Sequence, residues 1–216
     1  MKYKLIIFDL DGTVLDTLDD LMNSVNYALR KNSLPERSRE EVRAFVGNGI
    51  RLLIERAVPG GTVIGITDKV FADFKEHYAV HSCDNTRPYE GINELLTVLN
   101  EKGIKTAVVS NKADFAVQTL SERYFAGLFA VSVGERENIA RKPAPDSVNA
   151  VIEMLGVDKK SSVYVGDSEV DIETALNAGI PCISVDWGFR SRALLQEKGA
   201  ATIVSSADEL LHVLSD

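Results

Sequence analysis

A short apolar run that ends in two closely spaced carboxylates places the strongest constraint on how this chain folds. The run, Leu5-Ile6-Ile7-Phe8, is typical of a strand that is buried on both faces of a parallel sheet. It is followed by Asp9-Leu10-Asp11-Gly12-Thr13, in which the glycine permits a sharp turn. Ligands of open α/β sheets bind outside the carboxyl ends of the strands, so we expect this segment at a functional site. Two neighbouring negative charges there need a cation or hydrogen-bond donors from elsewhere in the chain.

Residues 16–83 have apolar residues at helical spacing and no convincing strand pattern. Asp16 or Thr17 could cap the first helix, and Ser38 with Glu41 has the spacing of a capping box. The helical segments are separated by Leu34-Pro35, Gly47-Asn48-Gly49 and Pro59-Gly60-Gly61. We therefore predict an all-helical block that is inserted after the first strand.

From residue 84 onward, strand-like runs alternate with helical segments. Strands are expected at 106–110, 129–133, 163–166, 182–185 and 202–204. Helices are expected between them, including one that starts near Lys112 and one that starts near Pro143. This alternation predicts the α/β class, with a doubly wound, mostly parallel, Rossmann-like sheet. The predicted domains are a discontinuous core of residues 1–15 and 84–216 and an inserted all-helical domain of residues 16–83.

The overall charge and the cysteines exclude several other classes. The 216 residues carry a net charge of −8, which disfavours broad binding to nucleic acid or to an anionic membrane. It leaves open a small anionic substrate, which needs only a local positive site. Cys83 and Cys182 fit neither a disulfide framework nor a metal motif. With no signal peptide and no apolar stretch near the ~20 residues that span a bilayer, we expect a cytoplasmic protein.

Polar side chains follow four of the predicted strands, and parallel topology would gather them at one edge of the sheet. They are Asp9, Asp11, Ser110, Asn111, Lys112, Lys142, Asp167 and Asp171. Four carboxylates in one cleft need a cation, and Mg²⁺ fits because it prefers oxygen ligands. The hydroxyl, the amide and the lysine are suited to holding the oxygens of a phosphoryl group.

Each of these groups also has a local structural explanation. Ser110-Asn111 could cap a helix, and Lys142-Pro143 could lie in a solvated loop. Asp167-Ser168 could cap a helix as well, with Asp171 complementing the helix dipole. Their occurrence together, at consecutive strand ends, favours a functional site.

These motifs resemble those of the haloacid dehalogenase superfamily of phosphohydrolases. The matching residues are Asp9-Leu10-Asp11-Gly12-Thr13, Ser110-Asn111, Lys142-Pro143, and Gly166-Asp167 with Asp171. The resemblance covers essentially the whole chain, and the insert resembles the helical cap of this family. Within the superfamily the chain is most similar to the phosphoglycolate phosphatase branch. That similarity lies in Asp16-Thr17-Leu18-Asp19-Asp20-Leu21, Gly47-Asn48-Gly49 and Val185-Asp186-Trp187-Gly188.

The resemblance implies a two-step phosphoryl transfer. Asp9 would attack phosphorus to give an aspartyl-phosphate. Asp11 would protonate the leaving oxygen and then deprotonate the water that hydrolyses the intermediate. Mg²⁺ would be held by Asp9, the backbone carbonyl of Asp11 and Asp167, with Asp171 orienting metal-bound waters or another outer group.

The resemblance also assigns the groups that bind the substrate. Ser110 and Lys142 would bind the transferring phosphoryl group, with Asn111 assisting. Gly47-Asn48-Gly49 would form a substrate loop whose backbone amides approach a small carboxylate at the next helix N-terminus. Arg51 is a candidate partner for that carboxylate, and a solvated helical arginine is an equal alternative.

The resulting prediction is a Mg²⁺-dependent phosphatase of a small phosphorylated metabolite, with 2-phosphoglycolate favoured, that acts as a monomer or homodimer. A β-phosphoglucomutase or a pyrophosphatase of the same fold is an alternative, although the insert shows no clear set of sugar-binding residues. A dehalogenase is disfavoured because Asp11-Gly12-Thr13 suits phosphoryl transfer. The alternative from another class is a non-catalytic phospho-acceptor switch. Receiver domains of that class lack an acid two residues after the acceptor and have no long helical insert.

Overall fold

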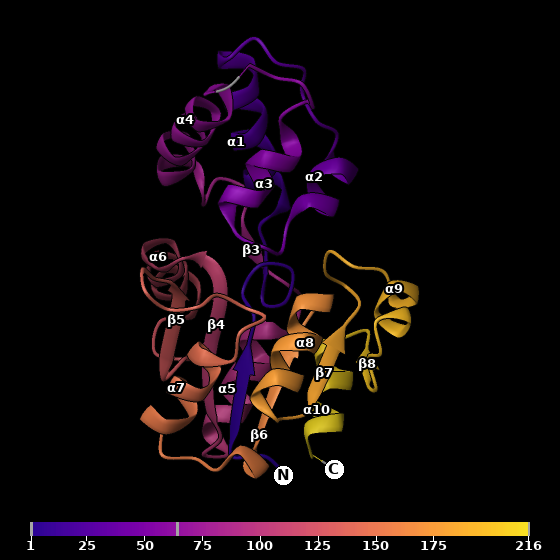
Figure 1. Ribbon diagram of the computed structural model, residues 1–216. Coiled ribbons are helices and arrows are strands. Elements are labelled where there is room, and N and C mark those ends of the chain that lie inside the picture. The colour runs from indigo at the N-terminus through magenta and orange to yellow at the C-terminus, as the bar shows by residue number, and fades with distance from the viewer. Residues whose placement is uncertain (1, 64, 216) are drawn as a thin grey trace.

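The core of the protein is a six-stranded parallel sheet with helices on both faces (Figure 1). We describe it from a computed structural model, over residues 2–63 and 65–215. The strand order is β5-β4-β1-β6-β7-β8, and each neighbouring pair is parallel. The strands are β1 (Leu5–Phe8), β4 (Lys105–Ala113), β5 (Val131–Glu135), β6 (Ser162–Gly166), β7 (Cys182–Val185) and β8 (Ile203–Val204). The predicted fold class is confirmed.

The central strand β1 is buried on both faces, as its sequence predicts. Ile6 and Phe8 pack into one apolar cluster with helices α5 (Ile92–Glu101), α6 (Asp114–Phe125) and α10 (Ala207–Ser215). Leu5 and Ile7 point to the other face, where α7 (Asp146–Met154) and α8 (Glu169–Ala178) pack. The short helices η1 (Lys159–Ser161) and α9 (Arg192–Glu197) complete the core. Alternate side chains of one strand therefore anchor both helical layers.

The insert is a helical block that lies over the carboxyl edge of the sheet (Figure 1). Its helices are α1 (Leu18–Lys31), α2 (Arg39–Phe45), α3 (Ile50–Ala57) and α4 (Ile66–His81). They surround an apolar cluster of their own, which Phe189 joins from the loop after β7. The capping box of α2 is confirmed, because the Glu41 amide donates to Ser38 Oγ at 3.2 Å and the Ser38 amide donates to Glu41 Oε2 at 2.7 Å. Thr17 occupies the N-cap position of α1, but its buried hydroxyl has no partner among the described residues.

Two short strands carry the chain between the core and the insert. β2 (Leu15–Asp16) pairs in antiparallel fashion with β3 (Arg87–Pro88). Beside them the buried carboxylate of Asp20 accepts hydrogen bonds from Asn85 and Thr86, including both backbone amides. Two residues are too few to show a strand pattern, so the sequence did not predict this ladder. The domain division stays a prediction, and its ranges include Met1, Ile64 and Asp216, which lie outside the described residues.

Strand β4 is longer than its apolar run suggests, and this corrects the predicted start of the next helix. Ser110, Asn111 and Lys112 lie inside β4, and α6 begins only at Asp114. Pairing with β5 resumes at Ala113 after an irregularity in the register. A helix-capping role for Ser110-Asn111 is therefore wrong. Within residues 2–63 and 65–215, no helix has the length and apolar character that a membrane crossing requires.

Candidate active site

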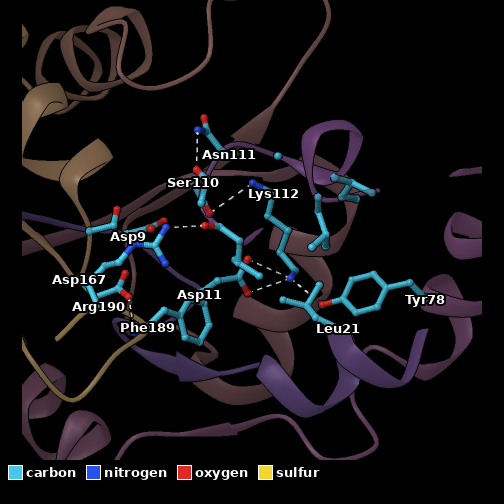
Figure 2. A pocket seen from close by; sticks show the side chains of 16 residues that line it. Asp9, Asp11, Leu21, Tyr78, Ser110, Asn111, Lys112, Asp167, Phe189 and Arg190 are labelled. Carbon is cyan, nitrogen blue, oxygen red and sulfur yellow. Dashed lines mark hydrogen bonds and ion pairs between the residues drawn. The ribbon is translucent and has the colours of Figure 1, made fainter. Parts of the chain in front are cut away.

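The predicted polar residues meet at the carboxyl edge of three adjacent strands. β1 lies between β4 and β6, so Asp9 and Asp167, which follow β1 and β6, lie beside Ser110 in the last part of β4. They line one pocket, whose opposite wall comes from the insert (Figure 2). Asp11 and Asn111 line it as well. The sequence-predicted convergence of these groups is thus present in the structure.

The turn after Asp9 brings the backbone against Asp167. The amides of Val14 and Leu15 both donate to the Leu10 carbonyl, at 3.1 and 3.0 Å, and fold the chain back on itself. Gly12 has a φ of +85°, and a Cβ at this position would collide with the Asp167 carboxylate. Only glycine satisfies both the backbone conformation and the close approach.

Lys142 joins two buried carboxylates of the site. Its Nζ lies 3.0 Å from Asp9 Oδ1 and 2.8 Å from Asp171 Oδ1, and it donates to the Tyr164 hydroxyl at 2.9 Å. Burial lowers the pKa of Lys142, but the charges of Asp171 and Asp9 more than offset this and raise it well above its ordinary value. Burial raises the pKa of Asp9 from 3.8 to about 6, opposed by Lys142 and reinforced by Asp171 and Asp11. The Asp9 carboxylate is therefore held in a dry site beside a permanent cation.

The remaining negative charge fits a divalent cation. Oxygens of Asp9, Asp167 and Asp171 lie within 4.8 Å of one another, and all three residues are buried. Burial raises the pKa of Asp167 well above its ordinary value, and the charges of Asp171 and Asp9 raise it further. Lys142 supplies one positive charge against three carboxylates, and oxygen-rich sites with excess negative charge suit Mg²⁺.

Asp171 is already committed to protein partners. Its Oδ1 contacts Lys142, while its Oδ2 accepts from the Ser168 amide at 3.0 Å and the Ser168 hydroxyl at 2.6 Å. The contacts with Ser168 form the capping box that the local explanation expected. The contact with Lys142 orients the lysine beside Asp9. Asp167 accepts from the Phe189 amide at 2.7 Å and, at the longer distance of 3.4 Å, from the Thr13 hydroxyl, so it keeps more of its coordination capacity. This difference favours Asp167 as a direct ligand and Asp171 as an outer group.

Ser110 and Asn111 differ in how free their side chains are. Both line the pocket. Asn111 Nδ2 donates to the Lys142 carbonyl at 2.9 Å and to the Gly47 carbonyl at 3.2 Å. The amide therefore ties the Gly47-Asn48-Gly49 loop of the insert to the backbone of Lys142. Among the residues that the structure describes, the Ser110 hydroxyl has one hydrogen bond, a long one of 3.4 Å that it accepts from the Lys112 amide.

The insert closes the pocket with apolar side chains and glycine backbone. The wall is formed by Leu21, Val46, Gly47, Gly49, Ile50 and Leu53, together with Phe189 of the core. The free space between these groups measures about 40 Å³. Gly47 and Gly49 thus lie where the sequence placed them, and both have positive φ, of +124° and +85°.

Two of the predicted insert residues do not reach the pocket. Asn48 Oδ1 accepts a hydrogen bond from Arg56 at 2.9 Å, and Asn48 is not part of the pocket wall. Arg51 pairs with Glu55 at 2.7 Å and with Asp68 at 2.6 Å on the surface of the insert. The suggestion that Arg51 faces the substrate is not supported, because its guanidinium is paired with Glu55 of α3 and Asp68 of α4. The alternative, a solvated arginine on the surface of the insert, agrees with its position.

The pocket contains two further cations, Lys112, which the sequence placed at this edge without a role, and Arg190, which it did not predict. Lys112 Nζ lies 2.8 Å from Asp11 Oδ1 and 2.6 Å from the Tyr78 hydroxyl. Burial lowers the pKa of Lys112, but Asp11 and Tyr78 raise it by more. Burial raises the pKa of Tyr78 to about 12. The position of Lys112 directly after Ser110-Asn111 was a sequence signal for a residue of the site. Tyr78 has no such signal, because its spacing is that of any apolar residue on the buried face of a helix.

Arg190 takes part in a reciprocal exchange with Arg43 of the insert. Its Nη1 and Nη2 donate to the carbonyls of Arg43 and Val46, at 3.0 and 2.8 Å. Arg43 donates in return to the carbonyls of Phe189 and Gly188, at 2.7 and 2.8 Å. No sequence signal identifies this arginine pair, because all four acceptors in the exchange are backbone carbonyls, which any residue supplies.

Comparison with known proteins identifies the family. The sequence model of the haloacid dehalogenase-like hydrolase family matches residues 6–185 of this chain. A phosphoglycolate phosphatase from Mesorhizobium japonicum is 33% identical, over 100% of this chain and 96% of that protein. One from Agrobacterium fabrum is 36% identical, over 86% and 81%.

Solved structures agree with this assignment. A crystal structure from Lactobacillus delbrueckii subsp. bulgaricus has a TM-score of 0.94 and 38% identity, over 99% of each chain. A predicted phosphoglycolate phosphatase from Haemophilus somnus has a TM-score of 0.92 and 28% identity, over 99% of this chain and 98% of that one. The prediction that the chain is an enzyme is confirmed together with its family. The chain belongs to the haloacid dehalogenase-like hydrolases, in their phosphoglycolate phosphatase-like branch.

Proposed function

We propose that this protein is a Mg²⁺-dependent phosphatase that hydrolyses a small phosphomonoester, with 2-phosphoglycolate as the favoured substrate. The observation that carries the proposal is the position of Asp9 in a small pocket between the sheet edge and the insert. There its carboxylate contacts Lys142, and Asp11 lines the same pocket two residues further on. A nucleophile and an acid/base on one rigid turn are what two-step phosphoryl transfer requires.

The chain's own residues account for both steps. In the first, Asp9 attacks phosphorus, the bond to the leaving oxygen breaks, and Asp11 gives that oxygen its proton. In the second, a water attacks the aspartyl-phosphate and gives a proton to Asp11, and Asp9 is released as a carboxylate. Ser110 and Lys142 hold the phosphoryl oxygens, and the insert excludes bulk water from the pocket.

We assign the metal to the buried acidic cluster. Asp9, Asp167 and the backbone carbonyl of Asp11 would hold Mg²⁺, and Asp171 would act through its contacts with Lys142 and Ser168. When bound, the ion neutralises the carboxylates and the negative charge of the phosphoryl group. The crowding of three buried carboxylates around one lysine supports this assignment.

The size and lining of the pocket support a small substrate. A cavity of about 40 Å³ holds about three water molecules. A space this small in the present arrangement favours a compact substrate. The relatives named phosphoglycolate phosphatase support the same choice.

We further propose that residues 16–83 act as a cap that opens on the β2–β3 ladder and lets substrate reach the pocket. The insert has an apolar cluster of its own, and its links to the core include the ladder, the Asp20 hydrogen bonds and the arginine exchange. Because the insert forms one wall of the pocket, its opening would widen the access of substrate to Asp9.

A substrate panel tests the proposal. Phosphate release is measured with phosphoglycolate, hexose phosphates, pyrophosphate and nucleotides, with Mg²⁺ or with a chelator. We expect many turnovers per chain on phosphoglycolate, dependence on Mg²⁺, and a loss of at least about 10³-fold in Asp9→Asn. Asp146→Asn, which removes an exposed acid on α7, is the matched control.

Two results would revise the proposal in different ways. A wide preference for pyrophosphate or a hexose phosphate would overturn the substrate and leave the mechanism standing. Stoichiometric labelling of the chain without steady phosphate release would favour the phospho-acceptor switch.

A further inference from the structure

We infer that Lys112 is a positioning residue for Asp11, and that Tyr78 of the insert completes this arrangement when the insert lies on the core. The inference rests on the proposed function, since it concerns the step in which Asp11 accepts a proton from water. It adds to the site one residue that acts through Asp11 and one that links Asp11 to the insert.

Lys112 holds both oxygens of the Asp11 carboxylate. Its Nζ lies 2.8 Å from Oδ1 and 3.1 Å from Oδ2. The Lys112 side chain is 2% exposed and that of Asp11 is 14% exposed, so solvent screens this ion pair little. Because Lys112 lies inside strand β4, the ammonium is presented from a rigid element next to β1. The carboxylate that must meet water and the leaving group is thereby held in one orientation.

Tyr78 supplies the remaining partner of Lys112 from the other side of the pocket (Figure 2). Its hydroxyl accepts from Lys112 Nζ at 2.6 Å, and the ammonium lies 4.8 Å from the ring centroid. Tyr78 is fully buried on α4 and stacks on Phe74, with ring centroids 5.2 Å apart. The hydroxyl therefore has a fixed position relative to the insert.

The contacts of Lys112 exclude a role as a substrate ligand in this arrangement. An ammonium has three donors, and the two Asp11 oxygens and the Tyr78 hydroxyl account for all three. Lys142, in contrast, lies against the nucleophile Asp9. The two lysines thus have different roles, since Lys142 lies beside the phosphoryl group at Asp9 and Lys112 orients Asp11.

This arrangement couples the insert to the second chemical step. If the insert opens, α4 carries Tyr78 away and Lys112 loses one acceptor. When the insert closes, Tyr78 fixes Lys112, which fixes Asp11 at the position from which it takes the proton of the attacking water. In that step the water oxygen bonds to phosphorus, the bond to Asp9 breaks with its electron pair returning to the carboxylate, and the proton passes to Asp11. Hydrolysis of the intermediate is therefore favoured in the closed pocket.

The two chemical steps can be separated with p-nitrophenyl phosphate. Its leaving group departs without needing a proton, so formation of the aspartyl-phosphate depends little on Asp11. In Lys112→Met we expect the rate of the p-nitrophenolate burst to change less than about threefold. The decay of the trapped phosphoenzyme should slow by roughly 10- to 100-fold, part of what acid–base catalysis contributes.

Tyr78→Phe provides a milder second variant, because it leaves the ion pair between Lys112 and Asp11 in place. We expect decay to slow by roughly 3- to 10-fold with the burst unchanged. In the double variant the two effects should be less than additive, because Tyr78 acts through Lys112. If Lys112→Met does not fold, Tyr78→Phe alone decides the question. Lys105→Met, at the exposed start of β4, and Tyr27→Phe, on α1, are the controls.

Several outcomes would overturn the inference. Equal slowing of burst and decay would show a merely structural role. A raised KM with an unchanged kcat would show a substrate ligand, and fully additive effects would show that Tyr78 acts independently. A wild-type protein that forms no phosphoenzyme would instead overturn the proposed function, which keeps the two failures distinct.

Discussion

The two sides of the pocket are built in different ways. On the sheet side, Asp9, Lys142 and Asp171 form a buried charge network within one rigid layer. On the insert side the wall is apolar, and the polar links to the core end largely on backbone carbonyls, as with Arg43 and Arg190. A fixed charge network suits the reacting atoms, whereas exchangeable hydrogen bonds suit a part that must open.

The energetics of the two sides should differ accordingly. Removing one partner of a buried charge network leaves other charges without compensation and costs about 3 kcal/mol or more. A hydrogen bond to a charged group contributes about 2 kcal/mol and re-forms with water when the insert opens. Four variants or conditions test whether this contrast between the two sides holds.

The largest effect is expected from Lys142→Met on the sheet side. Loss of the ammonium leaves Asp9 and Asp171 facing each other in a buried site, so the free energy of unfolding should fall by about 3 kcal/mol. Phosphatase activity should fall with it, since the cation next to the nucleophile is lost. Urea unfolding measures the first effect, with Lys105→Met as the matched lysine control. A loss of stability below about 1 kcal/mol would show that the network is not the rigid element.

The second effect concerns Mg²⁺ and pH. The folded-state pKa of Asp9 lies above its ordinary value of 3.8, at about 6, so the metal-free chain should lose stability as pH rises through this window. Metal binding requires ionised carboxylates, so Mg²⁺ should recover that stability increasingly at higher pH. The rise in Tm on adding Mg²⁺ should therefore grow between pH values of about 5 and 8. A rise that does not depend on pH, measured at matched ionic strength, would contradict the assigned ligands.

A smaller effect is expected on the insert side from Arg43→Ala. It removes the two hydrogen bonds to the carbonyls of Phe189 and Gly188 and should lower the population of the closed insert. We expect kcat/KM to fall by about tenfold, which corresponds to about 1.4 kcal/mol. Arg39→Ala, which removes an exposed ion pair with Asp19, is the control and should change kcat/KM less than about twofold. Equal effects of the two variants would mean that the arginine exchange does not hold the insert closed.

The smallest effect is expected from Arg51→Ala. Its partners Glu55 and Asp68 lie on the surface, where ion pairs contribute less than about 1 kcal/mol. The KM for phosphoglycolate should stay within about twofold of the wild-type value. A rise of tenfold or more would show that Arg51 turns into the pocket when substrate binds, and would restore the role that the resemblance suggested.

The sequence predicted the sheet side well because its signals are local. Apolar runs mark the strands, parallel topology brings their ends together, and Asp9, Ser110 and Asp167 follow from position alone. The same reasoning misplaced the start of α6, because the register between β4 and β5 depends on pairing between distant segments. The β2–β3 ladder escaped prediction for the same reason.

By itself, the sequence determined the parallel α/β fold, the helical insert and the group of acids, hydroxyl and lysine at one sheet edge. The tertiary structure decided which residues of the insert face that edge. Helical periodicity shows that Tyr78 lies on a buried face, but not that its hydroxyl reaches Lys112 across the pocket. It shows that Arg51 lies on α3, but not that its guanidinium stays on the surface. The reason is that strand ends are fixed by the topology of one sheet, whereas contacts between two packed bodies depend on their mutual orientation, which no local pattern encodes.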